Sequence, residues 1–151
     1  MNHPLPRGRY MSATHRSHGY TLIELMIVVG IVVILAAIAL PSYTRQIQQS
    51  RRTSAKTALL DVASREERYY AVNNSYTTLA NLGYTNLSGN NLLIPSASQD
   101  YYNVSVTVGT PTSSYTVTAV PQGTQASDTC GTYTLTGQGV QSDNGTASNC
   151  W

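Results

Sequence analysis

The strongest pattern in the chain is a continuous apolar run over residues 22–40, in which only Glu24 is ionisable. From Leu25 to Leu40 no side chain is charged or strongly polar. As an α-helix, residues 21–40 extend about 30 Å, close to the hydrocarbon thickness of a bilayer. Because a helix that is apolar on every side belongs in lipid or in the core of an assembly, the run predicts a membrane-spanning, assembly-forming helix.

The pattern becomes amphipathic after Pro41. Apolar residues then recur at spacings of three and four, with basic and amide side chains between them. Asp61 and Arg65 are placed to form an i,i+4 ion pair. We therefore expect one helix from about Thr21 to Tyr70, with Pro41 as a candidate kink. The recurring apolar positions are Tyr43, Ile47, Ala55, Ala58, Leu59, Val62, Ala63 and Tyr69.

Residues 71–100 break the helical period and carry Asn, Gly and Ser clusters that indicate loops. Three segments with period-2 alternation follow, which predicts strands. Because their connections are short, the sheet is expected to be antiparallel. The predicted fold is therefore α+β, a long N-terminal helix packed against a small antiparallel sheet. The residues expected on its apolar face are Tyr102, Val104, Val106 and Val108, then Tyr115, Val117 and Ala119, then Tyr133 and Leu135.

Charge is unevenly distributed. All three histidines and three arginines lie within residues 1–19, and nothing after Arg68 is basic. Without residues 1–19 the chain has six basic and seven acidic residues, a net charge of −1, and no histidine. An enzyme of the nucleophile–base type would lack its usual base. Glu66 and Glu67 are neighbours that point apart on a helix, and we expect them to form a solvated helix end. No catalytic residue, metal site or cofactor is predicted.

The chain contains two cysteines, Cys130 and Cys150, both in the polar C-terminal region. In an oxidising compartment such a pair is expected to form one disulfide. Closing the loop between the two cysteines is expected to stabilise the folded state by about 3 kcal/mol. Two free thiols, or half of a metal site, are the alternatives. The metal site is disfavoured because neither a histidine nor a third cysteine follows.

A secretory signal peptide is an alternative interpretation of the apolar run. It requires a small-residue cleavage site after the run, and residues 36–39 (Ala-Ala-Ile-Ala) are a poor match. The length of the run and the carboxylate of Glu24 near its start argue against this interpretation.

The segment from Gly19 to Glu24, Gly-Tyr-Thr-Leu-Ile-Glu, resembles the prepilin signature of type IV pilins. The resemblance implies cleavage after Gly19 by a prepilin peptidase, which also N-methylates the new terminal residue Tyr20. It implies that Glu24 meets the free amine of a neighbouring subunit during assembly, since a carboxylate in an apolar span is costly unless paired or near the interface. In this family the N-terminal helix unwinds locally inside the filament at Pro and Gly residues. Pro41 and Gly30 are the candidates for such unwinding in this chain.

The implied organisation is a leader at residues 1–19, a transmembrane and assembly half of the helix at 20–43, and a globular domain at 44–151. The sequence departs from the family in having Tyr20 where Phe is usual, and in a long leader that would be shorter if translation began at Met11. The precursor is expected in the bacterial inner membrane and the assembled protein in an extracellular pilus, with twitching motility, adhesion and DNA uptake as downstream roles. Its partners are other pilin subunits.

Later stretches resemble PilE-like minor pilins, which favours a minor subunit that aids assembly. They are Glu67-Arg68-Tyr69-Tyr70, Asn74-Ser75-Tyr76, Leu82-Gly83, Cys130-Gly131-Thr132-Tyr133-Thr134-Leu135 and Cys150-Trp151. A pseudopilin of a type II secretion system is the alternative. Direct nucleic-acid binding is not expected, because duplex DNA requires clustered Lys and Arg on an exposed face. Only Arg45, Arg51, Arg52 and Lys56 cluster, and assembly is expected to crowd that helix.

Overall fold

The computed structural model describes residues 19–96 and 98–151 of the chain. It divides into two compact units between Leu40 and Pro41. The helix α1, Leu22–Asn73, runs through that division and includes Pro41. The predicted helix is thus confirmed, although it ends three residues later than expected.

The second unit contains a six-stranded sheet whose strands follow each other in chain order, each antiparallel to the next. This simple meander confirms the predicted α+β architecture. Two short 3₁₀ helices accompany the sheet: η1, Leu79–Leu82, and η2, Gly123–Ser127. The strands are β1 (Leu87–Ser88), β2 (Asn91–Ser96), β3 (Gln99–Val108), β4 (Tyr115–Pro121), β5 (Tyr133–Thr136) and β6 (Gln141–Asp143).

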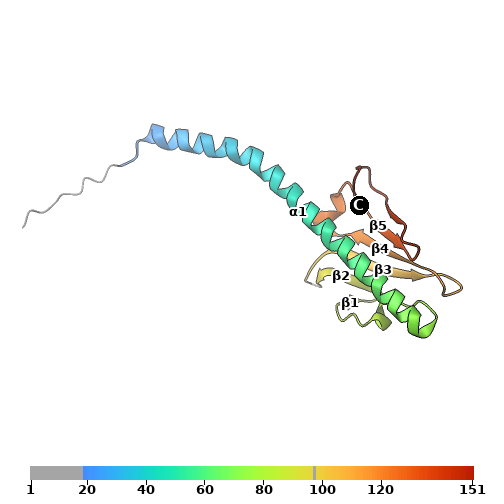
Figure 1. The fold of residues 1–151 in the computed structure, drawn as a ribbon. Helices are drawn as coiled ribbons and strands as arrows, with labels where there is room; N and C mark the ends of the chain where they lie inside the picture. The colour runs from blue at the N-terminus through green and yellow to red at the C-terminus, as the bar shows by residue number, and fades with distance from the viewer. Residues whose placement is uncertain (1–18, 97) are drawn as a thin grey trace, which may run out of the picture. The chain divides into compact units, whose positions relative to one another are not determined.

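The register of the central strands follows the predicted alternation. Val104 lies opposite Ala119, and Val117 lies opposite Leu135, so that their side chains share one face. That face is covered by the second half of α1, which crosses the sheet in Figure 1. Ala55, Leu59 and Val62, spaced by four and three, bury their side chains against it, as helical periodicity requires.

The sequence prediction missed three strands: β1 and β2, which lie within residues 71–100 that were expected to be loops, and β6, which lies beyond the last predicted strand. Strand β2 does not alternate: Leu92 lies on the core face opposite Val104, yet Leu93, on the other face opposite Asn103, is also largely buried. Strands β1 and β6 are short and polar, and backbone pairing with a neighbouring strand defines them rather than any apolar pattern.

Candidate processing and assembly site

Residues 22–40 form the apolar part of α1. Over this range the side chains are exposed or nearly so, and the helix is long and apolar enough to cross a bilayer. At 1.5 Å per residue its 19 residues extend about 28 Å. A soluble protein cannot leave so large an apolar surface in water, since each buried Leu or Ile side chain gains about 2 kcal/mol. This part of the helix therefore needs lipid or neighbouring helices.

The helix begins with a cap formed by Thr21. Its hydroxyl accepts a hydrogen bond from the backbone N–H of Glu24 at 3.3 Å, and its carbonyl accepts one from the N–H of Leu25 at 3.2 Å. Thr and Glu at this spacing form the sequence pattern of a capping box. The cap fixes Glu24 in the first helical turn, close in sequence to the junction between Gly19 and Tyr20. An acidic side chain in the first turn also interacts favourably with the positive end of the helix dipole.

Two glycines in this region are not required by the fold. A Cβ atom added to Gly19 or to Gly30 would meet no described atom within 4 Å, and Gly30 does not have a positive φ. Gly19 lies just before the helix, at the predicted cleavage position, and Gly30 lies inside the apolar span. Cleavage after Gly19, methylation of Tyr20 and pairing of Glu24 stay predictions.

The predicted unwinding between Gly30 and Pro41 also stays a prediction. The single chain is α-helical through both residues, whereas the unwinding was predicted for the assembled filament. The histidines and arginines of the predicted leader lie outside the described residues.

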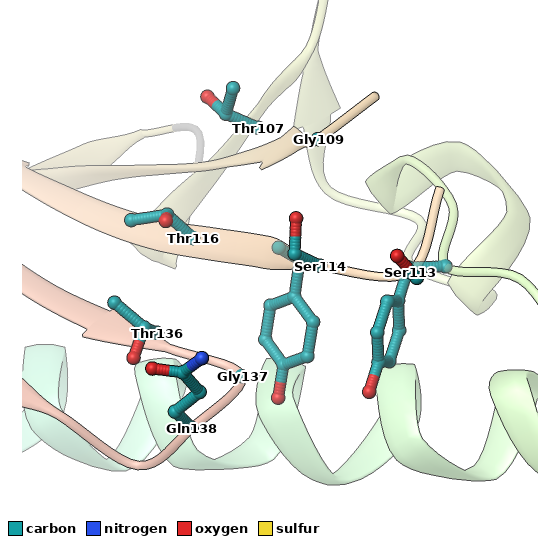
Figure 2. Close-up of a pocket in the computed structure, with 10 residues that line it drawn as sticks. Thr107, Gly109, Ser113, Ser114, Thr116, Thr136, Gly137 and Gln138 are labelled. Carbon is teal, nitrogen blue, oxygen red and sulfur yellow. The ribbon is translucent and has the colours of Figure 1, made fainter. Parts of the chain in front are cut away.

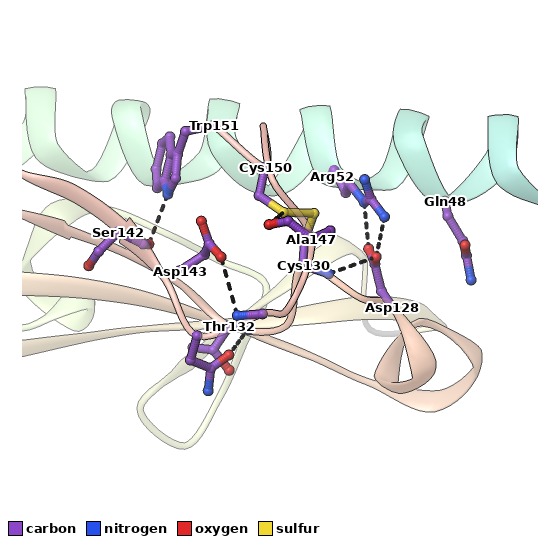
Figure 3. Close-up of a disulfide and its surroundings, with 12 residues drawn as sticks. Gln48, Arg52, Asp128, Cys130, Thr132, Ser142, Asp143, Ala147, Cys150 and Trp151 are labelled. Atoms are coloured by element: carbon purple, nitrogen blue, oxygen red, sulfur yellow. Dashed lines mark hydrogen bonds and ion pairs between the residues drawn. A yellow bond between two sulfur atoms is a disulfide. The ribbon is translucent and has the colours of Figure 1, made fainter.

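Cys130 and Cys150 form a disulfide, which confirms the predicted pairing (Figure 3). The end of the chain is held beside it. The indole N–H of Trp151 donates to the backbone carbonyl of Ser142 at 2.8 Å, and its ring packs edge-on against Tyr133 at 5.4 Å between centroids. The disulfide thus holds the C-terminus against the sheet.

A charged contact next to the disulfide ties α1 to the loop before β5. Arg52 donates through two nitrogens to the carboxylate of Asp128, whose side chain is fully buried. The same carboxylate accepts from the side chain of Gln125 at 2.5 Å and from the N–H of Cys130 at 3.2 Å. Burial alone would raise the pKa of Asp128, but these hydrogen bonds outweigh it and lower the pKa.

Glu66 corrects the sequence prediction of a solvated helix end, because it is buried, whereas Glu67 is exposed as expected. The side chain of Glu66 is fully buried and accepts from the N–H of Thr77 at 3.0 Å. Its other oxygen has no hydrogen-bond partner among the described residues. Burial therefore raises the pKa of Glu66, and the N–H of Thr77 offsets this only in part.

Glu67 accepts hydrogen bonds from the hydroxyls of Tyr76 at 3.1 Å and Tyr115 at 3.2 Å. The backbone N–H of Tyr76 donates to the carbonyl of Thr112 at 2.9 Å. These bonds join the chain leaving α1 to the sheet, so the acidic pair is structural. The local sequence shows two adjacent carboxylates near the end of a helix, and no signal in it reveals that the chain folds back over them.

The basic side chains of α1 are partly occupied. Arg52 is bound to Asp128, and Arg51 donates to the hydroxyl of Thr124 at 2.8 Å with its guanidinium 3.8 Å from the centroid of Tyr101. Arg65 pairs with Asp61 at 3.0 Å, as predicted. Within residues 19–96 and 98–151, no group of three His, Cys, Asp or Glu side chains is placed to hold a metal ion.

Comparison with known families gives two matches to this chain. Residues 41–134 match the family described as "Type IV minor pilin ComP, DNA uptake sequence receptor". Residues 14–40 match the prokaryotic N-terminal methylation motif. Together the two matches cover the capped helix start, the apolar span and most of the second unit.

Individual relatives include pilins from Myxococcus and Thermus. The chain is 40% identical over 76 residues to the type IV major pilin PilA of Myxococcus xanthus, covering 50% of this chain and 34% of that protein. It is 37% identical over 89 residues to the type IV wide pilus major component PilA4 of Thermus thermophilus, covering 56% and 68% respectively. This chain thus spans about a third of the length of the Myxococcus relative.

A solved structure of a type IV pilin from Shewanella oneidensis is similar to this one. The two share 31% sequence identity with a TM-score of 0.50, over 69% of this chain and 97% of the other. The structural comparison and the two family matches therefore indicate the same class of protein.

Proposed function

Because this chain belongs to the family of type IV minor pilins described as ComP, and is a structural subunit of the type IV pilin class, we propose that it is a minor pilin that aids pilus assembly. The observation that carries the proposal is the capped helix start, where Thr21 fixes Glu24 at the head of an exposed apolar helix. Family and fold are those of structural subunits, not of enzymes.

The proposed maturation follows from this helix start. A prepilin peptidase hydrolyses the peptide bond between Gly19 and Tyr20, which releases residues 1–19 as a leader and creates an amine on Tyr20. The same enzyme methylates that amine. The charged residue nearest to it is then Glu24, and the charged residue after that is Arg45.

Pairing between Glu24 and the terminal amine of a neighbouring subunit would neutralise both groups inside the filament. A carboxylate and an amine each cost several kcal/mol in an apolar medium, and a pair costs far less than two separate charges. Residues 20–43 would supply the membrane and assembly segment, and residues 44–151 the globular domain. The proposed location is the bacterial inner membrane before assembly and the extracellular pilus afterwards.

Abundance distinguishes a minor from a major pilin. The family description names a minor pilin, whereas the Myxococcus and Thermus relatives are described as major components. The test is to shear pili from the cells and quantify this chain against the most abundant subunit. A minor pilin is present in small amounts, and its deletion strongly reduces piliation and twitching motility. A chain that forms the bulk of the filament contradicts the proposal.

A pseudopilin of a type II secretion system is the alternative function. The deletion strain separates the two: retained pili with lost protein secretion would favour the pseudopilin.

DNA uptake is the second candidate function, because the family description includes a DNA uptake sequence receptor. The charges of this chain weigh against direct DNA binding by the globular domain. Arg51 and Arg52 are bound to protein groups, and no basic residue follows Arg68. Salt-dependent DNA binding by residues 44–151 would support the receptor function, and its absence would leave this chain with an indirect role in uptake.

A further inference from the structure

The sheet face opposite α1 carries hydroxyl side chains in two rows that run across the strands. The buried residues Val104, Val117 and Leu135 point toward α1, so their strand neighbours point away from it. In the first row Ser105 lies opposite Thr118, Thr118 opposite Thr134, and Thr134 opposite Ser142. In the second row Thr107 lies opposite Thr116, and Thr116 opposite Thr136. These seven residues are called the hydroxyl face.

The hydroxyl face is regular and accessible. Neighbouring strands lie about 4.8 Å apart and alternate residues along a strand about 6.8 Å apart, which sets the spacing of the two rows. All seven side chains are partly or fully exposed. Among the described residues, Thr116 and Thr118 form no side-chain hydrogen bond, so both hydroxyls are available to a ligand. Because threonine is restricted at χ1, little side-chain entropy is lost when its hydroxyl is engaged.

The hydroxyl face is also uncharged. Asp143, at the end of β6, lies opposite the buried Tyr133 and so belongs to the other face in register. The nearest residues beyond the two rows on the same face are Asn103 and Val120, which lie opposite each other. A DNA strand or an acidic polymer needs Lys or Arg to replace its counterions, and the seven residues of the hydroxyl face include neither. Its chemistry suits a neutral ligand with many hydrogen-bonding groups.

A cavity adjoins the second row. It has a volume of about 510 Å³ and is lined by Thr107, Thr116 and Thr136, together with Ser113, Ser114 and Gln138 from the flanking turns. Figure 2 shows these side chains at the ends of the strands. Two tyrosines, Tyr76 and Tyr115, and two glycines, Gly109 and Gly137, complete the lining. The volume lies in the range of small-molecule sites, and the lining is polar without being charged.

We propose that the hydroxyl face binds an uncharged polysaccharide, with the chain lying across the strands and one sugar unit in the adjoining cavity. The hydroxyls of the two rows exchange hydrogen bonds with the sugar hydroxyls, and the threonine methyl groups pack against sugar C–H groups. This activity is separate from subunit assembly, which uses residues 20–43, so either can fail without the other.

The test measures adsorption of the full mature chain to insoluble polymers. The chain is held in phosphocholine micelles, because sugar-based detergents would compete for the site. The neutral probes are microcrystalline cellulose and chitin, and the anionic probes are dextran sulfate beads and immobilised DNA. The proposal predicts adsorption to at least one neutral probe, competed by its soluble oligosaccharide and insensitive to salt.

The variant Thr116→Val/Thr118→Val removes two free hydroxyls from the central strand and keeps the side-chain shape. Its adsorption should be at least about fivefold weaker than that of wild type, because two hydrogen bonds are lost. Thr118→Ser keeps the hydroxyl and should retain adsorption. Thr57→Val, on the exposed side of α1, is the matched control and should behave as wild type.

Three results would overturn the proposal. They are equal adsorption by wild type and Thr116→Val/Thr118→Val, adsorption to the anionic probes alone, and no adsorption by wild type. Competition by the soluble oligosaccharide uses only the wild-type chain, so the test does not depend on any variant folding.

Discussion

Arg52 and Asp128, 76 residues apart in sequence, form a two-point ion pair that joins α1 to the loop carrying Cys130. The carboxylate is fully buried, whereas the guanidinium retains some contact with solvent. Replacing both partners of such a pair changes the stability of the fold little. Removing only one partner is costly, because the other charge stays buried without its counter-charge. The pair therefore fixes where the helix docks on the sheet.

Arg52→Ala should lower the free energy of unfolding of residues 44–151 by about 3 kcal/mol, because it leaves Asp128 buried without its cation. Urea unfolding measures the effect. The partly exposed pair of Arg65 and Asp61 provides the control. Loss of this pair in Arg65→Ala should lower the free energy of unfolding by less than Arg52→Ala does. Arg65→Ala also removes a hydrogen bond to the carbonyl of Leu82. Equal and small losses in both variants would contradict the assigned role of Arg52.

The same pair predicts how stability depends on pH. The folded protein lowers the pKa of Asp128, so the stabilisation is fully present above the ordinary aspartate pKa of about 3.9 and is lost as pH falls through the folded value. Unfolding measured from neutral pH to strong acid should show this loss in wild type. In Arg52→Ala the acid-dependent loss should be much smaller. An unchanged pH profile would show that Asp128 titrates independently of Arg52.

Glu66→Gln should act in the opposite sense. Burial raises the pKa of Glu66, so ionising its carboxyl group destabilises the folded state. This cost is absent at low pH, where the group is protonated, and is complete once the pH exceeds the raised pKa. Glutamine removes this cost and can still accept from the N–H of Thr77. The variant should therefore gain stability relative to wild type as pH rises above about 4.3, the ordinary glutamate pKa. A decline in the stability of Glu66→Gln relative to wild type with rising pH would contradict the burial argument.

Cys130→Ser/Cys150→Ser should destabilise residues 44–151 by about 3 kcal/mol, since the closed loop of the unfolded chain is released. Thermal unfolding in the presence and absence of a reductant measures this. Wild type should lose stability on reduction, whereas the double variant should not respond. A reductant effect of the same size in the variant would mean that the disulfide is not its cause.

Glu24→Gln should abolish or strongly reduce incorporation into pili while leaving cleavage and folding intact. Glutamine keeps the size and some hydrogen bonding but cannot form an ion pair with the terminal amine of a neighbour. Immunoblots of sheared pili and of the membrane fraction measure the distribution. Ile27→Val, one turn later in the same apolar helix, is the control and should assemble. Normal assembly of Glu24→Gln would remove the ion pair from the account.

The sequence predicted the parts of the fold that have a period. The buried stripe of Ala55, Leu59 and Val62 and the alternating strands around Val104 and Val117 follow from burial on one face, whereas the run to Leu40 is apolar on every side of the helix. Strand β2 was missed because Leu92 and Leu93 are both buried, on opposite faces. A non-alternating run between Asn and Pro does not reveal a strand.

Contacts between distant residues were beyond the reach of the sequence. Glu66 is buried because the chain returns over the helix and brings Thr77 to it, and Asp128 is buried because Arg52 approaches from 76 residues away. Neither partner is indicated by local spacing. In contrast, the predicted processing site depends on consecutive residues, Gly19 to Glu24, so the sequence alone could propose it.

Intact-mass analysis of the protein from purified pili tests the central claim most directly. The account predicts a single species with the mass of residues 20–151, plus CH₂ for one N-methylation and minus two hydrogens for the disulfide. Fragmentation should place the methyl group on the amine of Tyr20. A mature chain that begins after the apolar run, or one that retains residues 1–19 in the filament, would contradict the account.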